Sequence, residues 1–248
     1  ETEETLAAAS QGIKLGCRLV AVTSGGALAT LARGARATVL EVPTGLAPRG
    51  AFGHLFGIVA TLGTDWVLGD VEGELNAATD HLRDLRAELA PTSPARRNRA
   101  KRLATRLRRT VPIIYGAPPF NAIARRWQTQ LNENSKVLAF SSTLPEADHN
   151  EIVGWTSDRA AGRFTAVFLR DRAEPSELRL RLDATASMFA RRAKVVQVRD
   201  EHEQLLSRML GCLFLGDYVS LYLAFLYGID PYPMPAIDFL KAELGKAG

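Results

Sequence analysis

The residues best suited to acid–base chemistry lie in two segments of the second half of the chain, QTQLNENSKVLAF and LPEADHNEIVGW. The first contains Glu133 between Asn132 and Asn134, and the second contains His149. Asparagine is a poor helix former, so two asparagines in a predicted helix indicate that their side chains make hydrogen bonds. A carboxylate on a helix and an imidazole on a loop can both be tuned to transfer protons near neutral pH. The spacing alone, however, favours a plainer interpretation: an ion-paired or capping Glu133 and an exposed His149.

Two further residues, Arg49 and Thr2, are candidates for binding an anion. Arg49 follows Pro48 at the end of a predicted strand, where open α/β sheets bind ligands, and its guanidinium could stabilise an oxyanion. A surface ion pair explains Arg49 equally well. Thr2 begins a helix, and its hydroxyl could cap that helix or bind a phosphate; the cap is the simpler prediction. Lys241 is typical of a solvated helix lysine.

The sequence carries no recognisable metal or nucleotide motif. His54, His81 and His202 have no carboxylate or cysteine partner at metal-ligand spacing, so we expect no metal site. There is no G-x-x-x-x-G-K-[ST] loop and no G-x-G-x-x-G turn, and a tight turn explains the pair Gly25–Gly26. We therefore expect no cofactor.

Alternating strands and helices must position these residues. In the first half we expect a helix, a strand, a helix, a strand and an apolar helix, at 1–16, 17–24, 27–34, 37–43 and 50–63. A strand, helix and strand within about thirty residues form a βαβ unit, whose two strands are parallel. Two charged helices are then predicted over 74–109, interrupted by Pro91 and Pro94.

A second alternating set follows this interruption. It consists of strands at 110–117, 163–171 and 194–200, and of helices at 120–136, 203–228 and 234–244. The repeated alternation predicts two doubly wound α/β units with mainly parallel sheets, in three layers with helices on both faces. We place the division between residues 90 and 91. Because the sequence opens within a helix, with no strand before it, we expect the first unit to be incomplete.

Composition limits the classes of partner. The formal net charge is +4, and the excess lies mainly in one basic segment, residues 96–109, with Arg96, Arg97, Arg99, Lys101, Arg102, Arg106, Arg108 and Arg109. A nucleic-acid surface is one interpretation. No aromatic residue interleaves these charges, so a solvated helix face is the better one. Cys17 and Cys212, both in apolar surroundings, are predicted to be buried free thiols of a cytoplasmic protein, and no uninterrupted apolar run of about 18 residues indicates a membrane span.

Motifs along nearly the whole sequence resemble those of one enzyme family. TEETL, VPTGLAPRGAFG, RWQTQLNENSK, LPEADHNEIVGW and DPYPMPAIDFLK are similar to segments of the bifunctional phosphoglucose/phosphomannose isomerases, which contain two sugar-isomerase (SIS) domains. The pair NENSK and HNEIVGW is the most specific part of the resemblance. It implies that residues 1–90 are the C-terminal part of a first SIS domain, and that residues 91–248 are the second.

The resemblance implies a metal-free conversion between an aldose and a ketose 6-phosphate. Glu133 matches the family's catalytic base, which moves a proton between C2 and C1 through a cis-enediol. His149 matches the residue that opens the sugar ring, and it reaches the site from the partner subunit of a homodimer. Arg49 matches the arginine that stabilises the enediolate, Lys241 a lysine at the ring and hydroxyl end of the substrate, and Thr2 the last hydroxyl of the phosphate loop.

Two departures from the family pattern bear on activity. The Gly-Gly-Ser turn and the serines that precede TEETL in the family are not in this sequence, so we expect this polypeptide by itself to be inactive. The family's DPTPV segment, whose threonine is linked to the mannose epimer, reads Asp230-Pro231-Tyr232-Pro233-Met234 here. Glucose 6-phosphate is therefore the expected substrate, with mannose 6-phosphate left open. The alternative function is a non-catalytic SIS module that binds sugar phosphates.

Overall fold

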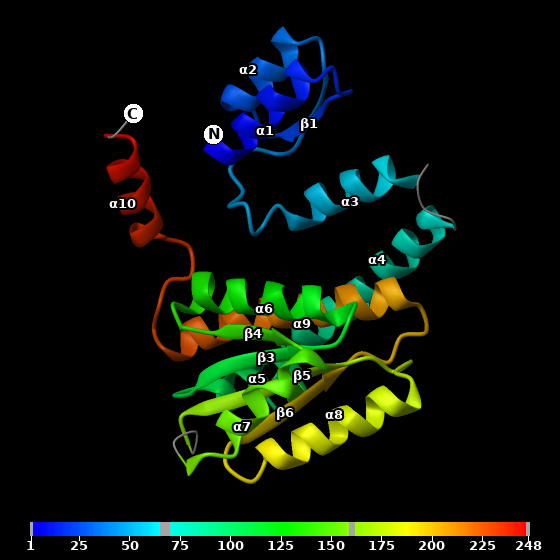
Figure 1. Cartoon of the computed structure of the whole chain (residues 1–248), viewed down its shortest axis with the longest axis vertical. Helices are drawn as coiled ribbons and strands as arrows, with labels where there is room; N and C mark the ends of the chain where they lie inside the picture. The colour runs from blue at the N-terminus through cyan, green and yellow to red at the C-terminus, as the bar shows by residue number, and fades with distance from the viewer. Residues whose placement is uncertain (1, 65–69, 159–161, 247–248) are drawn as a thin grey trace. The chain divides into compact units, whose positions relative to one another are not determined.

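The computed structural model describes residues 2–64, 70–158 and 162–246, which divide into two compact units, residues 1–72 and 73–248 (Figure 1). Each unit contains a parallel β-sheet accompanied by helices. The predicted fold class, α/β with parallel sheets flanked by helices, is therefore confirmed.

The first unit contains the predicted βαβ motif. Its elements are α1 (Glu3–Lys14), β1 (Val20–Thr23), α2 (Gly26–Gly34), β2 (Thr38–Glu41) and α3 (Phe52–Leu62). The two strands are parallel, with Val20 opposite Thr38. Gly25 and Gly26 both have positive φ angles, 130° and 70°, which glycine adopts without steric cost. They form the tight turn that the sequence predicts between β1 and α2.

The second unit is a doubly wound domain around four parallel strands in the order β4-β3-β5-β6. The strands are β3 (Val111–Gly116), β4 (Phe140–Thr143), β5 (Phe164–Arg170) and β6 (Lys194–Arg199). The helices are α4 (Val71–Leu89), α5 (Arg99–Leu107), α6 (Phe120–Ser135), α7 (Glu151–Trp155), α8 (Ser176–Phe189), α9 (Leu205–Leu226) and α10 (Pro235–Leu244). A 3-10 helix, η2 (Glu146–His149), follows β4.

The helices of the second unit cover both faces of its sheet. On one face α6 packs against β3, β4 and α9, and α9 packs in turn against α5. On the other face α8 packs against β5, β6 and α7, and α7 follows η2 directly (Figure 1). This two-sided arrangement gives the three layers that the alternating sequence predicts.

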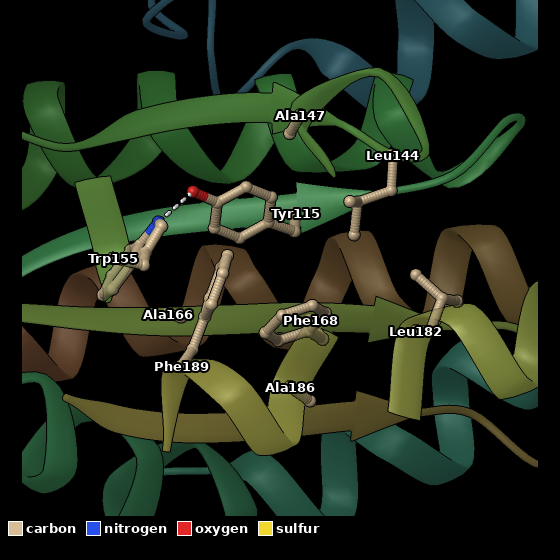
Figure 2. Close-up of a cluster of buried hydrophobic side chains, with 9 residues drawn as sticks. All are labelled: Tyr115, Leu144, Ala147, Trp155, Ala166, Phe168, Leu182, Ala186 and Phe189. Atoms are coloured by element: carbon tan, nitrogen blue, oxygen red, sulfur yellow. Dashed lines mark hydrogen bonds between the residues drawn. The ribbon is translucent and has the colours of Figure 1, made fainter. Parts of the chain in front are cut away.

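Aromatic side chains fill the core between the sheet and α8. Tyr115, Trp155, Phe168 and Phe189 are all buried there and meet ring to ring, with the Trp155 and Phe189 centroids 4.6 Å apart (Figure 2). The indole nitrogen of Trp155 donates a hydrogen bond of 2.7 Å to the Tyr115 hydroxyl, so the indole's one polar atom is satisfied. This core fixes α7 beneath the sheet.

Four elements lie where the sequence analysis assigned none: β4, the short helices η2 and α7, and α8. The strand β4 reads FSST, and three of its four residues are polar because it lies at the sheet edge, so it offers no apolar run. The helix α8 buries Leu182, Ala186 and Phe189, at helical spacing, but it also exposes Leu180. Because the apolar residues of α8 do not all lie on one face, the sequence pattern did not indicate a helix there.

Helix α9 explains why a long apolar stretch occurs in this chain. By length and mean hydropathy, 1.7, it is the one helix among the described residues that could cross a membrane. However, 61% of that stretch is buried within the fold, which is typical of the central helix of a globular domain. Contacts with α5 and α6 account for its apolar character.

The helix α4 precedes the predicted domain division yet packs within the second compact unit. Its Leu85 and Leu89 are buried, and the Tyr222 hydroxyl of α9 donates a hydrogen bond of 2.5 Å to the Leu89 carbonyl. The compact units consequently divide between residues 72 and 73, at the start of α4. This division is based on packing and does not locate domain boundaries in the sequence. The predicted domain division between residues 90 and 91 therefore stays a prediction.

Candidate active site

The last turn of α6 carries Glu133 and is held in place by hydrogen bonds from its neighbours. Asn134 donates from Nδ2 to the Ser220 hydroxyl of α9 at 2.9 Å, and the Ser135 hydroxyl donates to the Ser220 carbonyl at 2.6 Å. The Asn132 side chain accepts from the amide of Ala139, beside the start of β4, at 2.8 Å. The prediction that the two asparagines make hydrogen bonds is confirmed. Glu133 itself is half-buried.

Lys136 ends α6 and links it to the segment before α10. It adopts a left-handed conformation, with φ of 54°. Its ammonium donates to the Glu133 carbonyl at 2.5 Å and to the Pro231 carbonyl at 3.2 Å. Pro231 belongs to the DPYPM segment, so this segment lies beside the turn that carries Glu133. The same loop is ordered locally by Asp230, which accepts from the Tyr232 amide at 2.9 Å.

His149 ends the short helix η2, where the sequence analysis expected a loop. Its side chain is exposed, but the residues around it are anchored. Asp148 accepts a hydrogen bond from the Thr185 hydroxyl of α8 at 2.8 Å. Asn150 accepts from the Glu151 amide at 2.6 Å and thereby caps α7. The imidazole is therefore presented outward from a fixed turn.

Glu133 and His149 of one chain lie on opposite faces of the sheet. Glu133 is on α6, which shares its face with α9, whereas His149 is in η2, next to α7 and α8 (Figure 1). The four-stranded sheet lies between the layer of α6 and α9 and the layer of α7 and α8. The structure therefore does not bring the predicted acid–base pair together within a single chain.

The other three predicted site residues are distributed over both units. Thr2 is the N-cap residue of α1; its carbonyl accepts from the Leu6 amide at 3.1 Å, but its hydroxyl makes no capping bond with the described residues. Arg49 lies half-buried in the turn between β2 and α3. Lys241 is exposed on α10, none of whose described residues is buried. The hydroxyl of Thr2 is thus not committed to the capping role that the sequence favoured.

Comparison with known proteins matches both halves of the chain to one family. Residues 96–244 match the bacterial phospho-glucose isomerase C-terminal SIS domain. The chain is 37% identical, over 99% of its own length and 74% of the other protein, to the bifunctional phosphoglucose/phosphomannose isomerase of Caldicellulosiruptor bescii. This chain belongs to the bifunctional phosphoglucose/phosphomannose isomerase family. The Aquifex aeolicus member is 32% identical over 99% of the chain and 73% of its own length.

Solved structures of low sequence identity share the fold of this chain. A glucose-6-phosphate isomerase like protein from Thermus thermophilus superposes with a TM-score of 0.62. That structure is 23% identical to this chain, and the superposition covers 84% of this chain and 71% of that one. At this identity the similarity concerns the fold, which is the α/β fold with parallel sheets described above.

Three side chains of the basic segment, residues 96–109, donate hydrogen bonds to backbone carbonyls. Lys101 donates to the Pro91 and Ser93 carbonyls, Arg102 to the Arg96 carbonyl and Arg106 to the Val195 carbonyl. A cavity of about 560 Å³ lies between α5 and β6, lined by basic and apolar side chains. The cavity adjoins none of the five predicted site residues.

Two half-buried carboxylates near the candidate site were not anticipated from the sequence. Asp217 of α9 accepts from Gln130 at 2.8 Å and from Arg126, both on α6. Burial raises the pKa of Asp217 above its ordinary value, and the Arg126 guanidinium offsets only part of that rise. Glu151 accepts from two buried or half-buried hydroxyls beneath the sheet. The sequence signal for Glu151 is the motif HNEIVGW itself, in which it follows His149 closely.

Proposed function

We propose that this family member is a sugar-phosphate isomerase that interconverts glucose 6-phosphate and fructose 6-phosphate, with mannose 6-phosphate as a possible second aldose. Family membership supports the isomerase class. The observation that carries the finer proposal is the placement of Glu133. A general base must hold its carboxylate in one position, and the side chains of Asn132, Asn134, Ser135 and Lys136 all anchor the turn that carries Glu133.

The proposed reaction uses one carboxylate and no metal. The Glu133 carboxylate removes the proton from C2 of the open-chain aldose, the electron pair forms the C1–C2 double bond, and the carbonyl pair moves to O1, which takes up a proton to give a cis-enediol. The O2 hydroxyl then gives up its proton as the C2 carbonyl forms, and the Glu133 carboxyl returns its proton to C1. The ketose forms with no net change in protons, because the proton gained at O1 balances the one lost from O2. Arg49 stabilises the negative charge that develops on oxygen, a role for which a guanidinium is suited.

The remaining residues bind and open the substrate. Thr2, at the start of α1, contributes a hydroxyl to the phosphate, where the helix dipole favours an anion. Lys241 binds the ring and hydroxyl end of the sugar. His149 opens the ring and comes from the partner subunit of a homodimer. Its position across the sheet from Glu133 supports this assignment, because the elements that carry the two residues pack on opposite faces of the sheet.

We further propose that residues 91–248 form the second SIS domain and residues 1–90 the C-terminal part of the first. The family match over residues 96–244 supports the second domain. The helix α4 would then belong to the first domain in sequence while packing on the second. We propose the cytoplasm as the location, since the family's substrates are phosphorylated sugars.

Replacing Glu133 by glutamine in the whole protein tests the proposal. Glutamine has nearly the same shape but cannot accept a proton, so turnover of glucose 6-phosphate is expected to fall about 10³-fold or more. Binding of the substrate, measured by calorimetry, should persist. Glu146→Gln, at an exposed carboxylate outside the proposed chemistry, is the matched control and should retain wild-type turnover.

Two results would speak against this function. Near-normal kcat in Glu133→Gln would remove the catalytic base from the proposal. Wild-type protein that binds sugar phosphate and yet converts none, in a coupled assay for fructose 6-phosphate, would favour the non-catalytic sugar-phosphate module instead.

A further inference from the structure

The carboxylate of Glu151 joins the turn that carries His149 to two strands of the sheet. The Ser142 hydroxyl of β4 donates to its Oε1 at 2.5 Å, and the Tyr115 hydroxyl of β3 donates to its Oε2 at 2.5 Å. Both carboxylate oxygens are thus engaged by different strands. Hydrogen bonds to a charged acceptor are shorter and stronger than those between neutral groups.

The Tyr115 hydroxyl is held as a donor by its surroundings. Tyr115 is fully buried, and burial together with the hydrogen bond to Glu151 raises its pKa far above the ordinary value. The hydroxyl therefore keeps its proton, which points to Glu151. Its oxygen at the same time accepts the hydrogen bond from Trp155, the last residue of α7 (Figure 2). Glu151 and Trp155, at the two ends of α7, thus converge on a single hydroxyl.

The turn has a second anchor before His149. Asp148 accepts from Thr185 of α8 at 2.8 Å, and its other oxygen lies 3.7 Å from the Arg181 guanidinium. His149 therefore lies between one anchor to α8 and one anchor to the sheet. The imidazole itself is exposed and has no hydrogen-bond partner among the described residues. Its position therefore depends on the side-chain anchors of Asp148 and Glu151, which fix the backbone on either side of His149.

We propose that Glu151 is a positioning residue for His149: by fixing α7 to β3 and β4 it presents the imidazole to the site of the partner subunit. The inference rests on the ring-opening role proposed for His149. A catalytic group displaced by about 1 Å can lose about two orders of magnitude in rate, so an anchor two residues away is a sensitive control point.

Two substitutions at Glu151 separate hydrogen bonding from charge. In Glu151→Gln the amide oxygen can still accept from Tyr115, and the Ser142 hydroxyl can rotate to accept from the amide nitrogen. Glu151→Leu keeps similar bulk and removes both bonds. We expect Glu151→Leu to lower kcat about 10- to 100-fold, and Glu151→Gln to stay within about 3-fold of wild type. Tyr115→Phe, which removes one of the two bonds, should fall between them.

The informative readout is ring opening measured separately from isomerisation. Interconversion of the α and β anomers of glucose 6-phosphate, followed by exchange NMR on the whole protein, requires ring opening but no proton transfer at C2. Glu151→Leu should slow anomer interconversion, whereas Glu133→Gln should slow isomerisation alone. Glu146→Leu is the control and should alter neither rate, because the exposed Glu146 carboxylate bonds, among the described residues, to Asn150 of the same turn and to no strand of the sheet.

A double-mutant cycle distinguishes positioning from general stabilisation. If Glu151 acts through the imidazole, Glu151→Leu should change the anomer rate less than about 2-fold in a His149→Ala background. An equal loss in both backgrounds, or a wild-type anomer rate in folded Glu151→Leu protein, would overturn the inference while leaving isomerisation by Glu133 intact. A wild-type protein without any isomerase turnover would instead refute the proposed function, and the positioning role with it.

Discussion

The two segments that carry Glu133 and His149 are built in opposite ways. Glu133 lies in the last turn of a long helix, among buried side chains that bond to α9 and to the start of β4. His149 lies at the end of a single turn of 3-10 helix, exposed, and its neighbours are anchored to the sheet and to α8. The first segment is fixed by packing of one helix on another, and the second by a few polar contacts.

The difference shows how a site can be divided between subunits. A proton-transferring base gains from a rigid helix, because its distance to carbon must not vary. A group that has to reach a neighbouring subunit must instead be exposed, and a short anchored turn offers that exposure without a loose loop. The opposite placement of the two residues about the sheet agrees with the division of roles proposed above.

The rigidity of the helix that carries Glu133 can be tested most strongly at the contact between α6 and α9. A Cβ atom at Gly216 would lie 2.2 Å from Nε1 of the fully buried Trp127, whose indole donates to the Cys212 carbonyl at 2.9 Å. Gly216→Ala should therefore separate the helices and destabilise the fold by about 3 kcal/mol. Chemical denaturation measures this loss. Gly154→Ala, where a Cβ meets open space, should be nearly neutral, and equal stabilities for the two variants would show that α6 is not held tightly.

A smaller effect is expected when one hydrogen bond of the turn is removed. Asn134→Ala leaves the Ser220 hydroxyl without its donor and should cost about 1–2 kcal/mol of stability. Because Glu133 is the preceding residue, kcat should also fall about tenfold, with the KM for glucose 6-phosphate little changed. Asn121→Ala, at the opposite end of α6, makes the same substitution away from the turn. If both variants kept wild-type kcat, Asn134 would have no part in placing Glu133.

The anchoring of the segment that carries His149 can be tested by pH. Burial, and then the bond to Glu151, raise the pKa of Tyr115, whereas the pKa of an unfolded tyrosine is about 10. The folded state therefore holds a proton that the unfolded chain loses above about pH 10. Stability from this group is complete below that pH and is lost as the pH rises, by about 1 kcal/mol between pH 10 and pH 11.

Comparison with Tyr115→Phe isolates this loss from other alkaline groups. Cys212, whose pKa burial raises to about 12, and Tyr222, whose pKa burial also raises, titrate in both proteins and cancel in the difference. Wild-type protein should lose more stability than Tyr115→Phe over this range, as measured by thermal denaturation at each pH. Parallel pH profiles would mean that Tyr115 is not locked as a donor to Glu151.

The sequence was most informative about the buried elements. β3 and β5 read as apolar runs because both are central strands, and α6 and α9 have the apolar positions of core helices. β4 and α8 escaped prediction because their burial is one-sided: β4 is a polar edge strand, and α8 exposes Leu180. The local pattern of apolar residues indicates which elements are buried, so partly exposed elements are the hardest to predict from the sequence.

The candidate site was only partly predictable from residues. Asn132 and Asn134 pointed to hydrogen bonding, since asparagine weakens a helix without such bonds. The partners of Glu151 could not be predicted, because Ser142 and Tyr115 reach it from two different strands that only the tertiary fold brings together. Nor does spacing indicate that Glu133 and His149 lie on opposite faces of a sheet. That fact depends on the order of the strands.

The most direct test of the shared site mixes two inactive variants of the whole protein. In a hybrid dimer of Glu133→Gln and His149→Ala subunits, one site receives both substituted residues and the other receives intact Glu133 and intact His149. Random reassortment of equal amounts should therefore restore about one quarter of wild-type turnover of glucose 6-phosphate. If each site took both residues from one chain, every site in the mixture would carry a lesion. Turnover that stays at the level of the separate variants, despite hybrid dimers shown by native mass spectrometry, would contradict the shared site.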